Sequence, residues 1–240
     1  MSSFRSGRVQ AFREQSYFVV PAFLEATELR ELRRACDVVL ERVRAESNAN
    51  GHTSPSVNLL TNIEHFSGDP AALQRLTAFV ASARVCALLE GLAYADEARA
   101  PRLKKADYYH EQTRHDWDGD WHRDSQFKET DPDRERTLVL GTTSVHVRVA
   151  LEYDDRLEVV PGSHRRWDTN EELRIRKGAE RTSAAMPGAT RLVLRPGDAC
   201  VFHAWSIHRA TYLRAPLRRT LDSLYAFGRP EPARYPDFSG

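Results

Sequence analysis

The chain of 240 residues is long enough to form one domain around a buried core. Apolar residues make up 41% of it and charged residues 29%, and 35 Lys and Arg nearly balance 34 Asp and Glu. This balance gives no electrostatic reason to expect nucleic acid or a membrane surface as a partner. The first residues lack the apolar stretch of a signal peptide, and no apolar run is long enough to span a bilayer, so we expect a cytoplasmic protein.

The first hundred residues are predicted to be mainly helical. A short strand is expected at residues 17–20, where Pro21 ends it. A helix is expected to start at Thr27 or Glu28 and to end before residue 47, because apolar residues recur at spacings of three and four. The same spacing predicts a second helical region over residues 70–92.

Residues 101–228 are predicted to form the β core of a single domain that spans residues 1–240. Short runs rich in β-branched and aromatic residues alternate there with Pro-Gly turns. The expected strands are residues 103–109, 144–151, 157–160, 190–194, 199–203 and 219–227. Helices followed by many short strands predict a mainly β fold with α, in which N-terminal helices pack on a β-sandwich or jelly roll. The charged residues 165–181 are predicted to form an inserted helix or lid, and residues 229–240 a coil tail.

Two segments bring together side chains that can hold a metal ion. His122 and Asp124 are two residues apart, so an extended backbone points both side chains to the same face. His208 ends a second segment, residues 196–208, in which a Pro-Gly-Asp turn precedes an apolar strand. Two histidines and one carboxylate on one face of a metal leave its other positions free. This arrangement suits non-haem Fe(II), which needs those positions for a co-substrate and O₂.

An arginine stands shortly after the second of these segments. 2-Oxoglutarate chelates iron through its keto acid end, so its distal carboxylate needs a partner elsewhere. An arginine side chain can donate two parallel, charge-assisted hydrogen bonds to a carboxylate. Arg219, eleven residues after His208, is placed to be that partner.

Together these motifs resemble those of the phytanoyl-CoA dioxygenase family of Fe(II)/2-oxoglutarate oxygenases. The matching segments are W-H-x-D at residues 121–124, V-P-G-S-H at residues 160–164, P-G-D-strand-H at residues 196–208 and the arginine that follows. The resemblance implies a double-stranded β-helix, which is a cupin-like jelly roll.

The same resemblance implies roles for individual residues. His122, Asp124 and His208 would be the Fe(II) ligands, and Arg219 would bind 2-oxoglutarate. Arg218 is a weaker candidate for that role because its side chain should point the other way. The sequence departs from the pattern at residue 221, where a leucine stands in the place of a hydroxyl that assists the arginine in some relatives.

Five further histidines are expected to be structural, hydrogen-bonded or at the surface. His164 is predicted to stabilise the Pro-Gly-Ser turn before it. His203 is at an odd offset from His208, so strand alternation places the two on opposite faces. The histidines expected to be at the surface or hydrogen-bonded are His110, His115 and His146.

The loop before the metal ligands is rich in tryptophan and aspartate. Asp116, Trp117 and Trp121 are candidate substrate-binding residues, because aromatic faces with interleaved acids suit a sugar with amino groups. The alternative is a solvated acidic turn with one tryptophan folded into the core.

The predicted function is a dioxygenase that uses Fe(II), 2-oxoglutarate and O₂ to oxidise a small molecule. By resemblance to orthosomycin-type oligosaccharide-antibiotic oxygenases, the first candidate substrate is an aminoglycoside or oligosaccharide antibiotic, oxidised by ring closure, such as orthoester formation, or by hydroxylation. A hydroxylase of an amino acid or other small metabolite is the alternative. Two other classes stay open: a cupin-like metal hydrolase or isomerase, for which Arg219 would be dispensable, and a non-catalytic sugar-binding jelly roll. The oligomeric state is not predicted.

Overall fold

A computed structural model describes residues 2–50, 56–58, 63–93, 100–109, 116–179, 184–213 and 218–228. The helices are α1 (Ser2–Gln15), α2 (Ala26–Asn50), α3 (Pro70–Val80), α4 (Ala83–Leu89), α5 (Pro132–Gly141) and α6 (Asn170–Lys177). The strands are β1 (Tyr17–Val20), β2 (Ser56–Asn58), β3 (Arg102–Tyr109), β4 (Trp117–Asp118), β5 (Ser144–Ala150), β6 (Asp154–Val159), β7 (Thr190–Leu194), β8 (Ala199–His203), β9 (His208–Tyr212) and β10 (Thr220–Ala226). Short 3₁₀ turns are η1 (Ile63–Phe66), η2 (Asp124–Phe127) and η3 (Ser163–Arg165).

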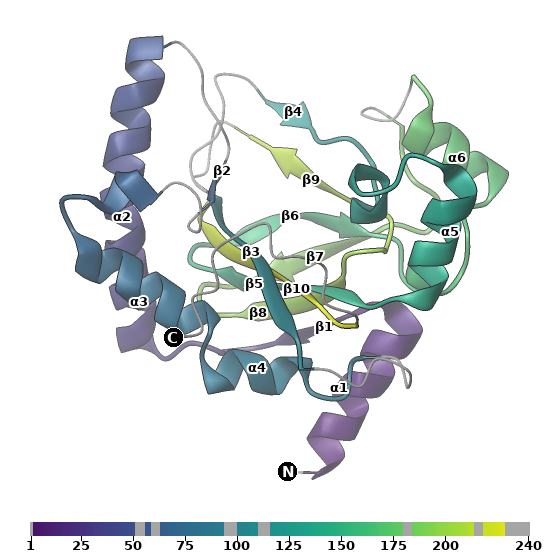
Figure 1. The fold of residues 1–240 in the computed structure, drawn as a ribbon, viewed down its shortest axis with the longest axis horizontal. Coiled ribbons are helices and arrows are strands. Elements are labelled where there is room, and N and C mark those ends of the chain that lie inside the picture. Colours follow the sequence, from purple (N-terminus) through teal and green to yellow (C-terminus); the bar gives the residue numbers. More distant parts are fainter. Residues whose placement is uncertain are drawn as a thin grey trace.

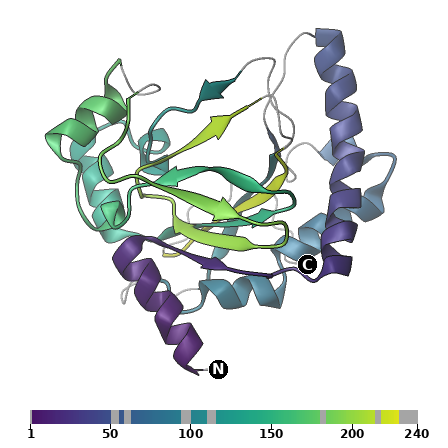
Figure 2. The same cartoon turned by 180° about the vertical axis from the view of Figure 1, so that it is seen from behind.

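Two antiparallel sheets form the core. The larger sheet has the strand order β1-β8-β5-β10-β3-β2, and the smaller has the order β4-β9-β6-β7. Helices α2 and α3 lie on one side of this core and α5 and α6 on the other (Figure 1). The view from behind shows β1 between α1 and α2, along the edge of the larger sheet (Figure 2). The expected mainly β fold with packed helices is confirmed.

Side-chain alternation divides the larger sheet into two faces. Val147 of β5 and Leu221 of β10 point to the helices, where they join the main apolar cluster. Ala150 of β5 and Phe202 of β8 point to the smaller sheet, where they pack in a second cluster with Leu157. Because side chains alternate along a strand, the even-numbered residues of β5 and β10 face the space between the sheets.

The predicted helical region 70–92 is broken into two helices. Asp69 caps α3 by accepting a hydrogen bond from the backbone N–H of Ala72, and Pro70 takes the first helical position. Ser82 caps α4 with its side chain, and its extended backbone separates the two helices. Residues 70–89 are long and apolar enough to cross a membrane by length and composition alone. However, α3 has 11 residues and α4 has 7, so each helix is too short to span a bilayer.

Several elements differ from the expectations. Helix α2 runs to Asn50 rather than ending before residue 47, and α1 was not expected. Helix α5 was also missed, although an aspartate before Pro132 is a recognisable start signal. The segment 196–208 is not one strand, because β8 ends at His203, a turn follows, and β9 begins at residue 208. The coil tail expected at residues 229–240 lies outside the described residues.

Two buried histidines pack together at the end of β8. The rings of His164 and His203 are 4.8 Å apart, and Phe12 stacks on His203. Burial, with the nearby Arg165, lowers the pKa of His164 to about 4, and burial with His164 lowers the pKa of His203 well below its usual value. Both rings are therefore neutral in the fold at pH 7.

These histidines predict a loss of stability in mild acid. The unfolded chain binds protons near pH 6.5 that the fold excludes, so stability is full above pH 6.5 and falls as the pH drops toward 4. We expect His164 alone to contribute up to about 1.4 kcal/mol per pH unit over that window. Urea unfolding of the metal-free protein between pH 7 and 5 should show a shallower fall for His164→Gln than for wild type. Parallel curves would contradict this prediction.

Candidate metal and co-substrate site

The structure brings the three predicted metal ligands together. One ligand atom from each of His122, Asp124 and His208 lies within 4.8 Å of the other two. Asp124 Oδ1 is 3.5 Å from His122 Nε2 and 3.6 Å from His208 Nε2. The backbones of His122 and His208 exchange two hydrogen bonds of 3.0 and 2.9 Å, which hold the two ligand-bearing segments side by side.

Both candidate histidine ligands are oriented by their own backbone. His122 Nδ1 lies 2.7 Å from the carbonyl oxygen of Asp120, and His208 Nδ1 lies 2.9 Å from that of Ser206. With Nδ1 donating to these carbonyls, each Nε2 carries a lone pair that a metal can take. Burial, with the neighbouring His122, lowers the pKa of His208 to about 3. His208 is therefore neutral, as a metal ligand must be.

The carboxylate of Asp124 is held from its other side. Its Oδ2 atom is 2.8 Å from His146 Nε2, and His146 Nδ1 is 2.5 Å from Asp222 Oδ1. Arg148 Nε donates to Asp222 at 2.8 Å. Oδ1 of Asp124 therefore faces His122 and His208, which complete the candidate metal triad. Its Oδ2 is hydrogen-bonded to His146. The expectation that His146 is hydrogen-bonded is confirmed, whereas residues 110 and 115 lie outside the described part of the chain.

The pKa values in this group follow from its contacts. Burial alone would raise the pKa of Asp124, but the neighbouring imidazoles of His122, His146 and His208 outweigh it and hold that pKa well below its usual value. Burial alone would lower the pKa of His146, but Asp222 and Asp124 raise it to about 10. A cationic His146 between two carboxylates is consistent with these contacts.

An exposed aromatic ring stands beside the triad. Phe127 ends the η2 turn that begins at Asp124, and it is 72% exposed. Its ring centroid lies 5.4 Å from that of His122. Phe127 was not among the predicted site residues, because its place beside the ligands depends on the 3₁₀ turn that follows them.

Arg219 does not occupy the position expected of a co-substrate anchor. Its Nε donates to the Tyr108 hydroxyl at 2.9 Å, and a terminal nitrogen donates to the Arg33 carbonyl at 3.0 Å and pairs with Asp37. Arg33 and Asp37 belong to α2, so Arg219 lies on the helix-facing side of the larger sheet. Neighbouring side chains point in opposite directions, as expected, but Arg219 is the one that faces the helices. Its role in binding 2-oxoglutarate stays a prediction, which these contacts do not favour.

Arg218 instead lies between the two sheets. It is 1% exposed, its Nε is 3.4 Å from Asp154 Oδ1, and its guanidinium lies 5.7 Å from the centre of the Tyr212 ring. Asp154 and Tyr212 belong to strands of the smaller sheet. Thr220 shares this side by alternation, and its buried hydroxyl has no hydrogen-bond partner among the described residues. An arginine and a hydroxyl thus line the interior two residues apart.

The three candidate substrate residues are not equivalent. Trp121 is 1% exposed, its indole N–H donates to the Ala184 carbonyl, and it packs in an apolar cluster, so it is a core residue rather than a substrate platform. Asp116 is exposed. Trp117 begins β4, where its backbone pairs with Tyr212. The prediction for Trp121 is therefore corrected, and those for Asp116 and Trp117 stay predictions.

The sequence matches a protein-family model over most of its length. The model is described as phytanoyl-CoA dioxygenase (PhyH), and it matches residues 12–220. The chain belongs to this family. Its predicted class, a 2-oxoglutarate-dependent oxygenase with iron as its metal, is thereby confirmed. No curated protein matches the sequence.

Solved structures share the fold of this PhyH-family chain at low sequence identity. AviO1 from Streptomyces viridochromogenes Tue57 aligns with a TM-score of 0.63 and 16% identity, covering 97% of both chains. The non-haem α-ketoglutarate-dependent epimerase SnoN from nogalamycin biosynthesis aligns at 0.60 and 18%, covering 99% of this chain and 93% of its own. EctD from S. alaskensis, solved with 2-oxoglutarate and 5-hydroxyectoine, aligns at 0.65 and 20%, covering 97% and 85%.

The donor set of the triad fits the metal of this family. Two neutral imidazole nitrogens and one carboxylate oxygen converge from one side, which is the 2-His-1-carboxylate set of non-haem iron oxygenases. The hydrogen bonds to Asp120, Ser206 and His146 fix all three donors in the orientation that a metal requires.

Proposed function

We propose that His122, Asp124 and His208 hold Fe(II), that Arg218 anchors 2-oxoglutarate, and that the enzyme oxidises a small molecule with O₂. The convergence of the three ligand atoms within 4.8 Å carries this proposal. Residues 1–240 would act as one oxygenase domain, and we retain a cytoplasmic location as part of the proposal.

In this proposal the iron and 2-oxoglutarate, when bound, supply the O₂-dependent oxidation, and the chain positions the reactants. His146 occupies one oxygen of Asp124, so the carboxylate would offer the metal a single oxygen. Arg218 and Thr220 would receive the distal carboxylate of 2-oxoglutarate in the buried space between the sheets. Phe127 would form part of the entrance through which the substrate approaches.

A tailoring role in antibiotic biosynthesis is the first proposal for the substrate. SnoN and the carbocyclase SnoK, both from nogalamycin biosynthesis, share the fold of this chain. An aminoglycoside or oligosaccharide antibiotic, modified by ring closure or hydroxylation, remains the first candidate. The alternative, hydroxylation of an amino acid or other small metabolite, draws support from EctD, whose structure holds 5-hydroxyectoine.

Succinate formation tests the proposal. Protein reconstituted with Fe(II) without oxygen and then given 2-oxoglutarate and O₂ should form succinate, and candidate substrates should increase the rate. Panels of aminoglycosides, amino acids and other small metabolites separate the substrate classes. Substrate turnover that persists when 2-oxoglutarate is omitted would favour the hydrolase or isomerase alternative and overturn the proposal.

A further inference from the structure

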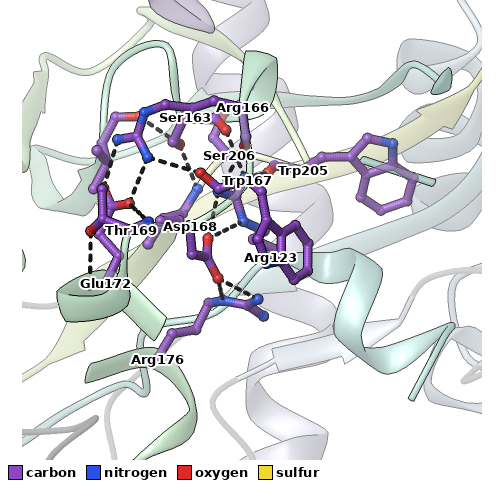
Figure 3. Close-up of polar contacts among 12 residues, drawn as sticks. Arg123, Ser163, Arg166, Trp167, Asp168, Thr169, Glu172, Arg176, Trp205 and Ser206 are labelled. Atoms are coloured by element: carbon purple, nitrogen blue, oxygen red, sulfur yellow. Dashed lines mark hydrogen bonds and ion pairs between the residues drawn. The ribbon is translucent and has the colours of Figure 1, made fainter. Parts of the chain in front are cut away.

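A buried chain of four charged side chains lies behind the metal ligands. Asp168 accepts two hydrogen bonds from Arg123, at 2.9 and 2.7 Å, and two from Arg176, at 2.8 and 2.6 Å (Figure 3). Arg176 also donates to Glu135 at 2.9 Å. The side chains of the two arginines and Asp168 are 0% exposed, and that of Glu135 is 1% exposed. Positive and negative side chains therefore alternate in this buried group, and solvent hardly reaches any of the four.

Arg123 connects the two segments that carry the candidate ligands. It stands between His122 and Asp124 in the sequence, and its side chain extends to the buried contacts shown in Figure 3. One terminal nitrogen donates both to the Ser163 carbonyl, at 2.9 Å, and to the Trp205 carbonyl. Trp205 lies in the turn that leads into β9 and its first residue, His208. A single guanidinium thus ties together the backbones on both sides of the triad.

Arg176 and Glu135, at the other end of this buried group of charges, contact the residues just after Asp124. Arg176 of α6 donates to the side-chain oxygen of Gln126 at 2.8 Å. Glu135 of α5 accepts from the Ser125 hydroxyl at 3.0 Å. The residues on each side of Asp124 are therefore fastened to the same buried chain, and through it to α5 and α6.

Stability alone gives a weak reason for this arrangement. Removing four charges from water is costly, and apolar side chains of similar size often stabilise a fold as well or better. Ion pairs that share several hydrogen bonds also fix the relative geometry of their partners. Here the geometry that they define is that of the ligand-bearing backbone.

We propose that Arg123 and Asp168, supported by Arg176 and Glu135, are positioning residues that preorganise His122, Asp124 and His208 for the metal. The proposal rests on the proposed function, because it assumes that these three residues bind the metal. It also makes α5 and α6 part of the support of the metal site.

Cobalt binding to the 240-residue chain tests the proposal without requiring turnover. Co(II) is titrated into wild type and Asp168→Asn by calorimetry, and the visible absorption of bound Co(II) reports the ligand geometry. We expect Asp168→Asn to weaken Co(II) binding by about 10- to 100-fold and to change the spectrum. Ser125→Ala, which removes one hydrogen bond to Glu135, should weaken binding by about three- to tenfold and is far less disruptive to folding.

Leu76→Ala is the matched control for a general loss of stability. Leu76 is fully buried in α3, within the apolar cluster that packs on the helix-facing side of the larger sheet. Its truncation should lower the Tm without changing the affinity or the spectrum of Co(II). An equal loss of affinity in Leu76→Ala would overturn the inference, because the effect would then follow stability.

Two further outcomes separate this inference from the proposed function. If His122→Ala abolishes Co(II) binding but Asp168→Asn and Ser125→Ala retain the wild-type affinity and spectrum, the inference fails and the proposed function stands. If wild type and His122→Ala bind Co(II) equally, the proposed metal site fails and the inference fails with it.

Discussion

Asp124→Ala is expected to lower the affinity for Fe(II) by more than about 100-fold and to abolish succinate formation. The effect should exceed the 10- to 100-fold that is typical of losing a group outside the ligand set, because this change removes a donor atom itself. His146 contacts the carboxylates of both Asp124 and Asp222, so this change leaves it with Asp222 alone of the two. Anaerobic Fe(II) titration and a succinate assay provide the two measurements.

Two variants frame this result. His146→Gln keeps the Asp124 carboxylate but changes its support, so we expect an intermediate loss of Fe(II) affinity of about 10-fold or more. Asp155→Ala removes an acid of β6 that pairs with the adjacent Arg156, and it should leave Fe(II) affinity unchanged. Tight Fe(II) binding by Asp124→Ala would show that the carboxylate is not a ligand.

The residues of the metal triad were predictable because two short motifs mark them, although His122 and His208 are far apart in the sequence. His122 and Asp124 are two residues apart, and the Pro-Gly-Asp turn marks the segment that leads to His208. The strand break between His203 and His208 did not affect the prediction, because His208 still pairs with His122 at the start of β9. A local pattern tolerates an error in the boundary of the element that contains it.

The support of the triad could not be predicted in the same way. His146, Asp222 and Asp124 come from segments far apart in the sequence, and no spacing marks them as neighbours. Their contact depends on the antiparallel register of β5 and β10, which pairs Asp222 with Arg148. The burial of Trp121 likewise follows from apolar residues contributed by several distant segments.

The co-substrate arginine illustrates a third case. Strand alternation correctly predicts that Arg218 and Arg219 point in opposite directions, but it does not say which direction is the interior. That choice is made by the packing of Leu221 and Tyr225 against the helices, which turns the odd-numbered side chains of β10 outward. Some relatives have a hydroxyl where this chain has Leu221. With Arg218 as the anchor, the hydroxyl of Thr220, two residues later, takes that place.

Arg218→Met is expected to raise the KM for 2-oxoglutarate by about 100-fold. Charge-assisted hydrogen bonds contribute about 1.5–3 kcal/mol each, and 1.4 kcal/mol corresponds to a factor of ten. Arg219→Met is the matched control. It removes contacts to Tyr108 and Asp37 on the helix side, so it should lower the Tm while changing the KM by less than about threefold.

Steady-state succinate kinetics at saturating O₂ and substrate would measure both values. Thr220→Val should raise the KM by about three- to tenfold, because it removes one neutral hydrogen-bonding group from the same interior side. The reverse order, with Arg219→Met impairing 2-oxoglutarate binding and Arg218→Met leaving it intact, would return the anchoring role to Arg219. Both variants remove the same charge from adjacent residues. A difference between their KM values therefore reports the direction in which each side chain points, not the loss of charge.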